Sequence, residues 1–275
     1  MSGKCRYSAR VLRVLISTVS LHLQQKLLHR EFWIQLVIER ALPLAIPLLA
    51  WLSIYNFAQA DALSGWSKNG MIAYYLLVFV IGLFTDIQFH YEMSAMVHMG
   101  TLTQWLIRPL SFFETILSHV IARIVLLFIP GIAALLLGLW LIPGAFSALT
   151  LPLVLRSLVV LPFSLVLFSL LSVSVGMLSF WLIKTDSIFA LLMLVLEFFG
   201  GRLLPLEMLP SWLQNISRFL PMRFAIAGPV ESILHPQSSS LFSLLFGQIT
   251  WSVILLILVV LIWRAGIRHY DAVGG

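Results

Sequence analysis

The sequence predicts an all-α, polytopic membrane protein: a single transmembrane domain over residues 1–275 with six spans, an amphipathic N-terminal helix and a re-entrant outer hairpin. Hydrophobic residues make up 60% of the chain and charged residues only 10%. A soluble domain carries about 25% charged residues, and so few charges cannot cover a water-facing surface. Soluble enzymes are therefore excluded, and so are disordered proteins, which need low hydrophobicity.

Residues 5–30 are expected to form an amphipathic helix. Arg6, Arg10 and Arg13 recur at helical spacing and continue into a polar stripe, while leucines occupy the other face. A helix of this kind lies in the membrane interface with its basic face among lipid headgroups. The alternative is a cytosolic extension of the first span.

The long hydrophobic runs of the sequence predict the membrane-spanning helices. Five of them are expected at residues 33–55, 71–90, 112–142, 151–183 and 241–263. The third and fourth exceed a hydrocarbon core of about 30 Å, so both should tilt or project into water. A further run, 187–199, has about 13 apolar residues against the ~20 that a span needs.

The segment 201–225 is predicted to be a re-entrant helical hairpin on the outer side. Gly200 and Gly201 stop the preceding helix, and Pro205 and Pro210 frame a turn. Trp212 is placed to anchor at the outer interface. The hairpin would form a lid over the outer end of a translocation path.

Lysine and arginine set the expected orientation. The chain has a net charge of +6, which positive-inside loops explain without nucleic acid. Ten basic residues fall on the inner side of this topology: Lys4, Arg6, Arg10, Arg13, Lys26, Arg30, Arg108, Lys184, Arg264 and Arg268. Four fall on the outer side: Lys68, Arg202, Arg218 and Arg223. Both termini are therefore expected to be cytoplasmic.

The inner connector over residues 91–111 is the expected contact with a soluble partner. Its apolar positions recur as on one face of a short helix, which Gly100 would end in a left-handed conformation. Arg108 can reach phosphate headgroups or an acidic rim on the partner. The residues assigned to this coupling contact are Met93, Met96, Val97, His98, Gly100, Leu102 and Arg108. The alternative is an ordinary solvated loop.

The chain lacks the motifs of the common catalytic and cofactor sites. It has no P-loop, no helical pair of histidines at metal-ligand spacing and one cysteine. We therefore expect no catalytic residue, cofactor or metal in this chain. A stand-alone secondary transporter or channel is the main alternative to an ATP-driven transporter, and an intramembrane enzyme is a third, more remote hypothesis.

Two local patterns carry a family resemblance. The string GWS at 65–67 leads to MIAYY at 71–75, and MGTLTQWLIRPLS occupies 99–111. With LPL at 204–206 and LPSWL at 209–213, the chain resembles the permease subunit of an ABC type-2 exporter, of the small bacterial subgroup, over essentially its whole length. Val97-His98 stands where that family often has Ile-Arg.

The resemblance implies a mechanism. Two permeases, identical or related, form the path between them in the bacterial cytoplasmic membrane. Two ABC ATPase subunits bind below and hold the ATP and magnesium. The apolar walls of this chain suit an amphipathic, lipid-linked or drug-like cargo.

Glu197 is the expected mid-membrane carboxylate. A carboxylate at that depth costs several kcal/mol unless it faces protein or water. One interpretation is a structural pair with an arginine such as Arg202 or Arg223. The other is a polar element of the translocation path or of the permease–permease interface.

Overall fold

The computed structural model describes residues 42–59, 62–63, 65–85, 89–103, 112–141, 151–182, 185–235 and 240–270, with a few scattered positions before residue 42. Most of the predicted interfacial helix over 5–30 lies outside these residues, and Arg108 lies outside them as well.

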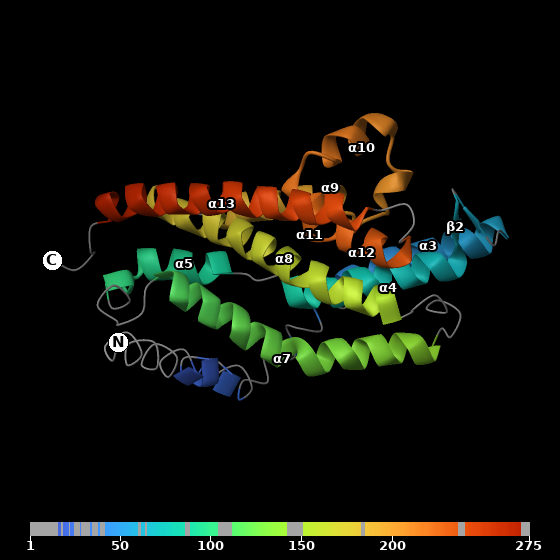
Figure 1. The fold of residues 1–275 in the computed structure, drawn as a ribbon, viewed down its shortest axis with the longest axis horizontal. Helices are drawn as coiled ribbons and strands as arrows, with labels where there is room; N and C mark the ends of the chain where they lie inside the picture. The colour runs from blue at the N-terminus through green and yellow to red at the C-terminus, as the bar shows by residue number, and fades with distance from the viewer. Residues whose placement is uncertain are drawn as a thin grey trace.

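The described chain is an elongated bundle of helices (Figure 1). Its longer helices are α3 (Leu42–Ala58), α4 (Lys68–Thr85), α5 (Phe89–His98), α7 (Phe112–Leu141), α8 (Leu151–Gly176), α9 (Asp186–Phe199) and α13 (Leu241–His269). The shorter ones are the 3₁₀ helices η2 (Met177–Phe180) and η3 (Leu206–Met208), and the α-helices α10 (Ser211–Ser217), α11 (Pro221–Ala225) and α12 (Ala227–Leu234).

A small hairpin marks one end of the bundle. β1 (Ala62–Leu63) pairs antiparallel with β2 (Trp66–Ser67), and Gly65 in the turn has a φ of +85°, which suits glycine. Figure 1 places this hairpin at one end, called here the hairpin end. α5 and the C-terminal end of α13 lie at the other end, called the α5 end.

Three described helices are long and apolar enough to cross a membrane, by length and composition: Ile116–Ala133 in α7, Leu155–Phe180 in α8 and η2, and Leu241–His269 in α13. α3 and α4 contribute shorter apolar stretches, Ala45–Ala58 and Lys68–Leu83. The protein is thus a mostly helical, multi-pass membrane protein. The count of six spans stays a prediction.

Several expected span ends are wrong by a few residues. The structure describes the second helix, α4, as far as Thr85 and a separate helix, α5, from Phe89, so the expected span to His90 includes the first two residues of α5. α8 changes to a 3₁₀ helix at Met177, and α13 continues six residues beyond the expected end at Trp263. A basic residue does not stop a helix at the membrane surface, because long basic side chains extend to the headgroups.

The larger hydrophobic cluster lies toward the hairpin end. Its largest fully buried members include Tyr55, Tyr74, Tyr75, Phe168 and Met71. The Tyr55 hydroxyl donates to the carbonyl of Trp66 at 2.8 Å and ties the hairpin to α3. The Trp66 ring also meets His235 edge-on, with ring centroids 5.1 Å apart, which brings the end of α12 to the hairpin.

A second cluster lies at the α5 end. It joins α5 to α8, η2 and α13 through Phe89, Met93, Val97, Leu102, Val173, Met177, Phe180 and Val259, among others. Gly176 allows this packing, because a Cβ there would lie 2.8 Å from the Cα of His90. Gly266 similarly makes room for the Phe180 ring. Small residues at helix contacts let the backbones approach closely.

Candidate functional site

The expected coupling element exists as a short helix. α5 spans ten residues, Phe89–His98, and Gly100 follows it with a φ of +71°. The Met99 N–H donates to the carbonyl of Ala95 at 2.9 Å, and the Thr103 hydroxyl donates to the carbonyl of Gly100 at 2.8 Å. The local prediction of a helix closed by a left-handed glycine is therefore confirmed.

The apolar face of α5 packs against its own chain. Met93 is fully buried, Val97 and Leu102 are buried with it, and Met96 is half-buried. This differs from the expectation that these side chains meet a partner. Apolar periodicity identifies the face that is covered, but it does not say whether the same chain or another one covers it.

The outward face of α5 carries different residues. Tyr91 is 51% exposed and Met99 is 75% exposed. His98 is also exposed, so it keeps the surface position that its assignment requires. In this conformation a partner would meet these three side chains rather than Met93 or Val97.

His90 ties α5 to two neighbours. Its ring is fully buried and stacks on Phe189 of α9. Its backbone N–H donates to the Ser172 hydroxyl of α8 at 3.3 Å. Burial lowers the pKa of His90 to about 3, so the imidazole is neutral at physiological pH.

A second link runs from α5 to the start of α9. The Thr185 hydroxyl lies 3.1 Å from the Ser94 hydroxyl, within hydrogen-bond distance. Together with the stacked rings of His90 and Phe189, it attaches α5 to α9. A displacement of α5 would therefore be passed to α8 and α9 together.

α9 stops where the glycines predicted. It ends at Phe199, Gly200 caps it, and the Gly200 N–H donates to the carbonyl of Leu196 at 2.8 Å. Gly201 follows with a φ of +76°. α9 is too short to cross a membrane, so the chain turns before it could reach the far side by helix alone.

Two tyrosines of α4 bind the non-helical backbone that follows α9, called here the break. The Tyr74 hydroxyl donates to the carbonyl of Gly201 at 2.6 Å, and the Tyr75 hydroxyl donates to the carbonyl of Leu203 at 2.5 Å. Carbonyls that leave a helix inside a membrane need such donors. Neither tyrosine was among the predicted site residues, although two adjacent tyrosines inside an apolar run were a signal in the sequence.

Glu197 pairs across the break. Its carboxylate lies 3.4 Å from the guanidinium of Arg202, one of the two arginines considered for it. The Glu197 side chain is 37% exposed and the Arg202 side chain 15%. The other candidate, Arg223, pairs with Glu231 at 3.1 Å instead.

The buried part of the expected hairpin extends beyond its predicted bounds. α11 and α12 pack among α4, α8 and α13, and every residue from Ala225 to Val230 is buried. The buried helices thus continue to Leu234, nine residues past the predicted end at 225. Pro229 does not break α12, because it stands in the first turn, where proline is tolerated.

The first part of the segment 201–225 is more open. Pro205 is buried and Pro210 exposed, and η3 lies between them. Trp212 on α10 is 61% exposed, as an interfacial anchor requires. In Figure 1, α10 stands apart from the long helices on one side of the bundle.

Gln248 of α13 fastens α11 to the bundle. Its fully buried amide nitrogen donates to the Ser164 hydroxyl at 2.9 Å and to the carbonyl of Phe224 at 3.0 Å. The neighbouring Gly247 leaves room for the Phe224 ring. The sequence analysis missed Gln248, although an amide inside an otherwise apolar span indicates a specific partner.

In the parts of the chain that the structure describes, no three His, Cys, Asp or Glu side chains gather closely enough to hold a metal ion. The family model described as "ABC-2 family transporter protein" matches residues 41–274. No curated protein matches the chain.

Proposed function

Since the chain belongs to the ABC-2 family of transporter proteins, we propose that it is the membrane-spanning subunit of an ATP-driven exporter. Two copies of an ABC ATPase would bind it and hold the ATP and magnesium. A second permease, identical or related, would supply the other half of the translocation path. The observation that carries the proposal is the family match over residues 41–274.

The proposal includes an orientation. The α5 end faces the cytoplasm of a bacterial cell, with both termini on that side, and the hairpin end faces outward. Arg264 and Arg268, at the C-terminal end of α13, then lie inside, and Lys68 at the start of α4 lies outside. The larger inner share of basic residues supports this direction.

α5 is the proposed coupling helix. Tyr91, His98 and Met99 would contact the ATPase, and the buried face of α5 would pass the motion to α8 and α9. A short helix can dock in a groove of a partner through a few exposed apolar side chains. Because α5 packs closely on α8 at Gly176, the two helices would move as one body.

The outer end is the proposed gate. The break after α9 and the re-entrant helices α11 and α12 would close the path, and Glu197 would line it or face the second permease. The 37% exposure of the Glu197 side chain leaves it accessible for either role. Apolar walls around one ion pair suit an amphipathic, lipid-linked or drug-like cargo.

Co-purification tests the proposal. The tagged chain is isolated in mild detergent, the co-eluting ATPase is identified, and ATP hydrolysis is measured. Met99→Glu should release the ATPase or abolish stimulated hydrolysis, because it places a charge on the exposed face of α5. Asn215→Glu adds the same charge at an exposed site on α10 and serves as the matched control. A chain that transports in vesicles with no ATPase present would instead support a stand-alone transporter or channel.

A further inference from the structure

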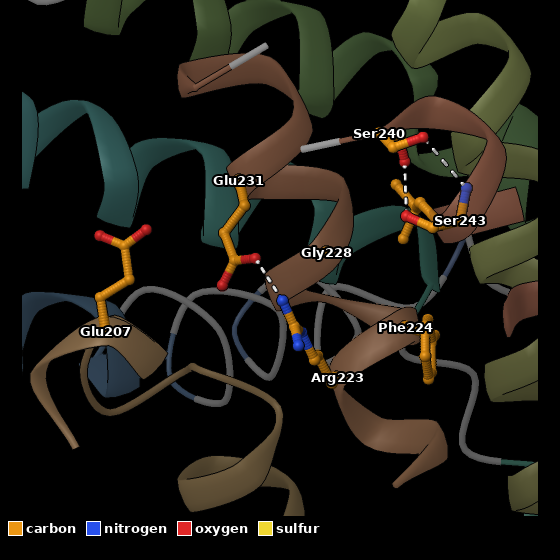
Figure 2. Close-up of a pocket in the computed structure, with 8 residues that line it drawn as sticks. Glu207, Arg223, Phe224, Gly228, Glu231, Ser240 and Ser243 are labelled. Atoms are coloured by element: carbon orange, nitrogen blue, oxygen red, sulfur yellow. Dashed lines mark hydrogen bonds and ion pairs between the residues drawn. The ribbon is translucent and has the colours of Figure 1, made fainter. Parts of the chain in front are cut away.

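A cavity of about 340 Å³ lies toward the hairpin end, between η3, α11, α12 and the first turn of α13. Figure 2 shows the residues around it: Glu207, Arg223, Phe224, Gly228, Glu231, Ser240 and Ser243, with Leu244 completing the wall. A neighbouring cavity of about 160 Å³ shares the three charged residues of this wall and adds Gln214 and Arg218. The larger cavity is within the range of about 300–1,000 Å³ that small-molecule sites occupy.

Most of the polar groups in the wall are already engaged. Arg223 and Glu231 form the 3.1 Å ion pair, and the Glu231 side chain is only 12% exposed. Ser240 caps α13, since its hydroxyl accepts from the Ser243 N–H at 3.5 Å, and the Ser243 hydroxyl donates to the Ser240 carbonyl at 3.0 Å. The arginine and the positive end of α13 are therefore largely satisfied within the protein.

Glu207 differs from the rest of the wall. Among the residues that the structure describes, its carboxylate has no ion-pair partner. In Figure 2 the Glu231 carboxylate reaches Arg223, whereas Glu207 stands apart on η3. Two carboxylates and one guanidinium thus face the larger cavity, which has a net negative wall.

The sign of this charge selects the ligand. Burial raises the pKa of Glu231, and its ion pair with Arg223 lowers it. The nearby Glu207 carboxylate, a like charge that repels that of Glu231, raises the pKa again. A cation in the cavity would relieve that repulsion, and an anion would add to it. Arg218, the other arginine beside these two cavities, lines only the smaller one.

We propose that this cavity binds the ammonium group of an amine, held by the Glu207 carboxylate beside the Arg223–Glu231 pair. The Ser243 hydroxyl and the Phe224 ring edge the same space and can contact the rest of the ligand. The source of the ammonium is either an aminolipid headgroup or a free amine. The inference is independent of the proposed transport function, because binding is measured on the chain without nucleotide or cargo.

A matched series of two-carbon probes tests which ligand charge the cavity prefers. The full chain is placed in nanodiscs that contain only phosphatidylglycerol, and its thermal midpoint is followed against ethanolamine, ethylene glycol and glycolate. Ethanolamine should stabilise the protein saturably but with weak affinity, because the ion pair that it forms with Glu207 is partly exposed. Ethylene glycol and glycolate should not. A preference for glycolate, or no saturable effect of ethanolamine, would overturn the proposal.

Two substitutions locate the site. Glu207→Gln should weaken ethanolamine binding about fivefold, whereas Asp186→Asn, which removes an exposed carboxylate at the start of α9, should leave it unchanged. Arg223→Gln frees the Glu231 carboxylate and should strengthen binding, an effect of opposite sign that a folding defect would not produce. Equal ethanolamine binding in the native chain and in Glu207→Gln would show that the amine binds elsewhere.

Nanodiscs that contain phosphatidylethanolamine distinguish the two sources. If a lipid headgroup occupies the cavity, it should compete with added ethanolamine for the native chain. Glu207→Gln should bind the headgroup more weakly, so this competition should disappear in that variant. Unchanged ethanolamine binding in these discs would identify a free amine as the ligand. Both results support an ammonium site. Failure of these tests would not affect the result of ATPase co-purification, which tests the proposed function separately.

Discussion

The two ends of the bundle are held together in different ways. At the α5 end, α5 packs tightly on α8 through apolar side chains, with Gly176 against the backbone of His90. At the hairpin end, side-chain donors such as Tyr74, Tyr75 and Gln248 hold carbonyls of irregular backbone. Tight packing transmits displacement, because packed interiors are hardly compressible. Separate hydrogen bonds can open one at a time, which suits a gate.

The largest effect should come from breaking the tight packing. Gly176→Val puts a Cβ at 2.8 Å from the Cα of His90 and 3.0 Å from the Cβ of Met93. Because the first of these is a backbone atom, α5 must move, and we expect a loss of about 3 kcal/mol in the free energy of unfolding. The thermal midpoint and the ATPase stimulation should fall together.

Gly82→Ala is the control for that substitution, since its Cβ would meet only ordinary contact, at 3.7 Å from Arg202. If Gly176→Val kept native stability and coupling, the α5 end would not be the rigid body described above.

The next largest effect is expected at Gln248. Gln248→Leu leaves the Phe224 carbonyl without this donor in the bundle interior and should cost about 2 kcal/mol. The expected functional result is a gate that leaks, measured as nucleotide-independent efflux of a trapped dye from vesicles. Thr250→Val, at an exposed site on the same helix, should not leak. A tight Gln248→Leu variant would contradict a gating role for α11.

Acidification should weaken the α5 end selectively. Because the pKa of His90 is about 3 in the folded protein and near 6.5 when unfolded, the unfolded chain binds more protons as the pH falls below 6.5. The native state is therefore fully favoured above pH 6.5 and loses stability between pH 6.5 and pH 3. The loss should be about 2 kcal/mol at pH 5.

His90→Phe keeps the ring stack with Phe189 and should flatten this dependence of the thermal midpoint on pH. An unchanged slope in His90→Phe would mean that another group is responsible.

The smallest expected effects are those of the tyrosine hydroxyls. Tyr74→Phe and Tyr75→Phe should each cost about 0.6 kcal/mol, the average for hydrogen bonds between membrane helices. Hydrogen exchange should rise at residues 200–204 and stay unchanged in α5. Tyr91→Phe, at the other end, is the control. Faster exchange throughout the bundle would show that the hairpin end does not open locally.

The sequence predicted local features better than their surroundings. Gly100 adopts the left-handed conformation predicted for it, and α9 ends beside Gly200 as expected, because a glycine acts on its own backbone. The burial of Met93 and Val97 could be predicted, but not that α8 and η2 bury them. The buried helices α11 and α12 continue past residue 225, and this could not be predicted because the burial of Val230 depends on α4 and α8, which are distant in sequence.

The sites held by distant partners were the hardest to predict. Tyr75 lies 128 positions from Leu203, whose carbonyl it binds, and Gln248 lies 84 positions from Ser164. The sequence around Tyr75 or Gln248 does not indicate which distant residue is the hydrogen-bond partner. Glu197 was easier, since Arg202 is only five positions away and a carboxylate at membrane depth requires a cation nearby.

Cross-linking from α5 tests the central claim most directly. In a Cys5→Ser background, single cysteines are introduced by Met99→Cys and Val97→Cys, and the membranes are treated with a short thiol–amine cross-linker in the presence of the co-purifying ATPase. The exposed position 99 should cross-link to the ATPase, and the buried position 97 should not, with the yield at 99 changing when ATP is added. Cross-linking from 97 but not from 99, or from neither, would contradict the claim that α5 couples this permease to its ATPase through its outward face.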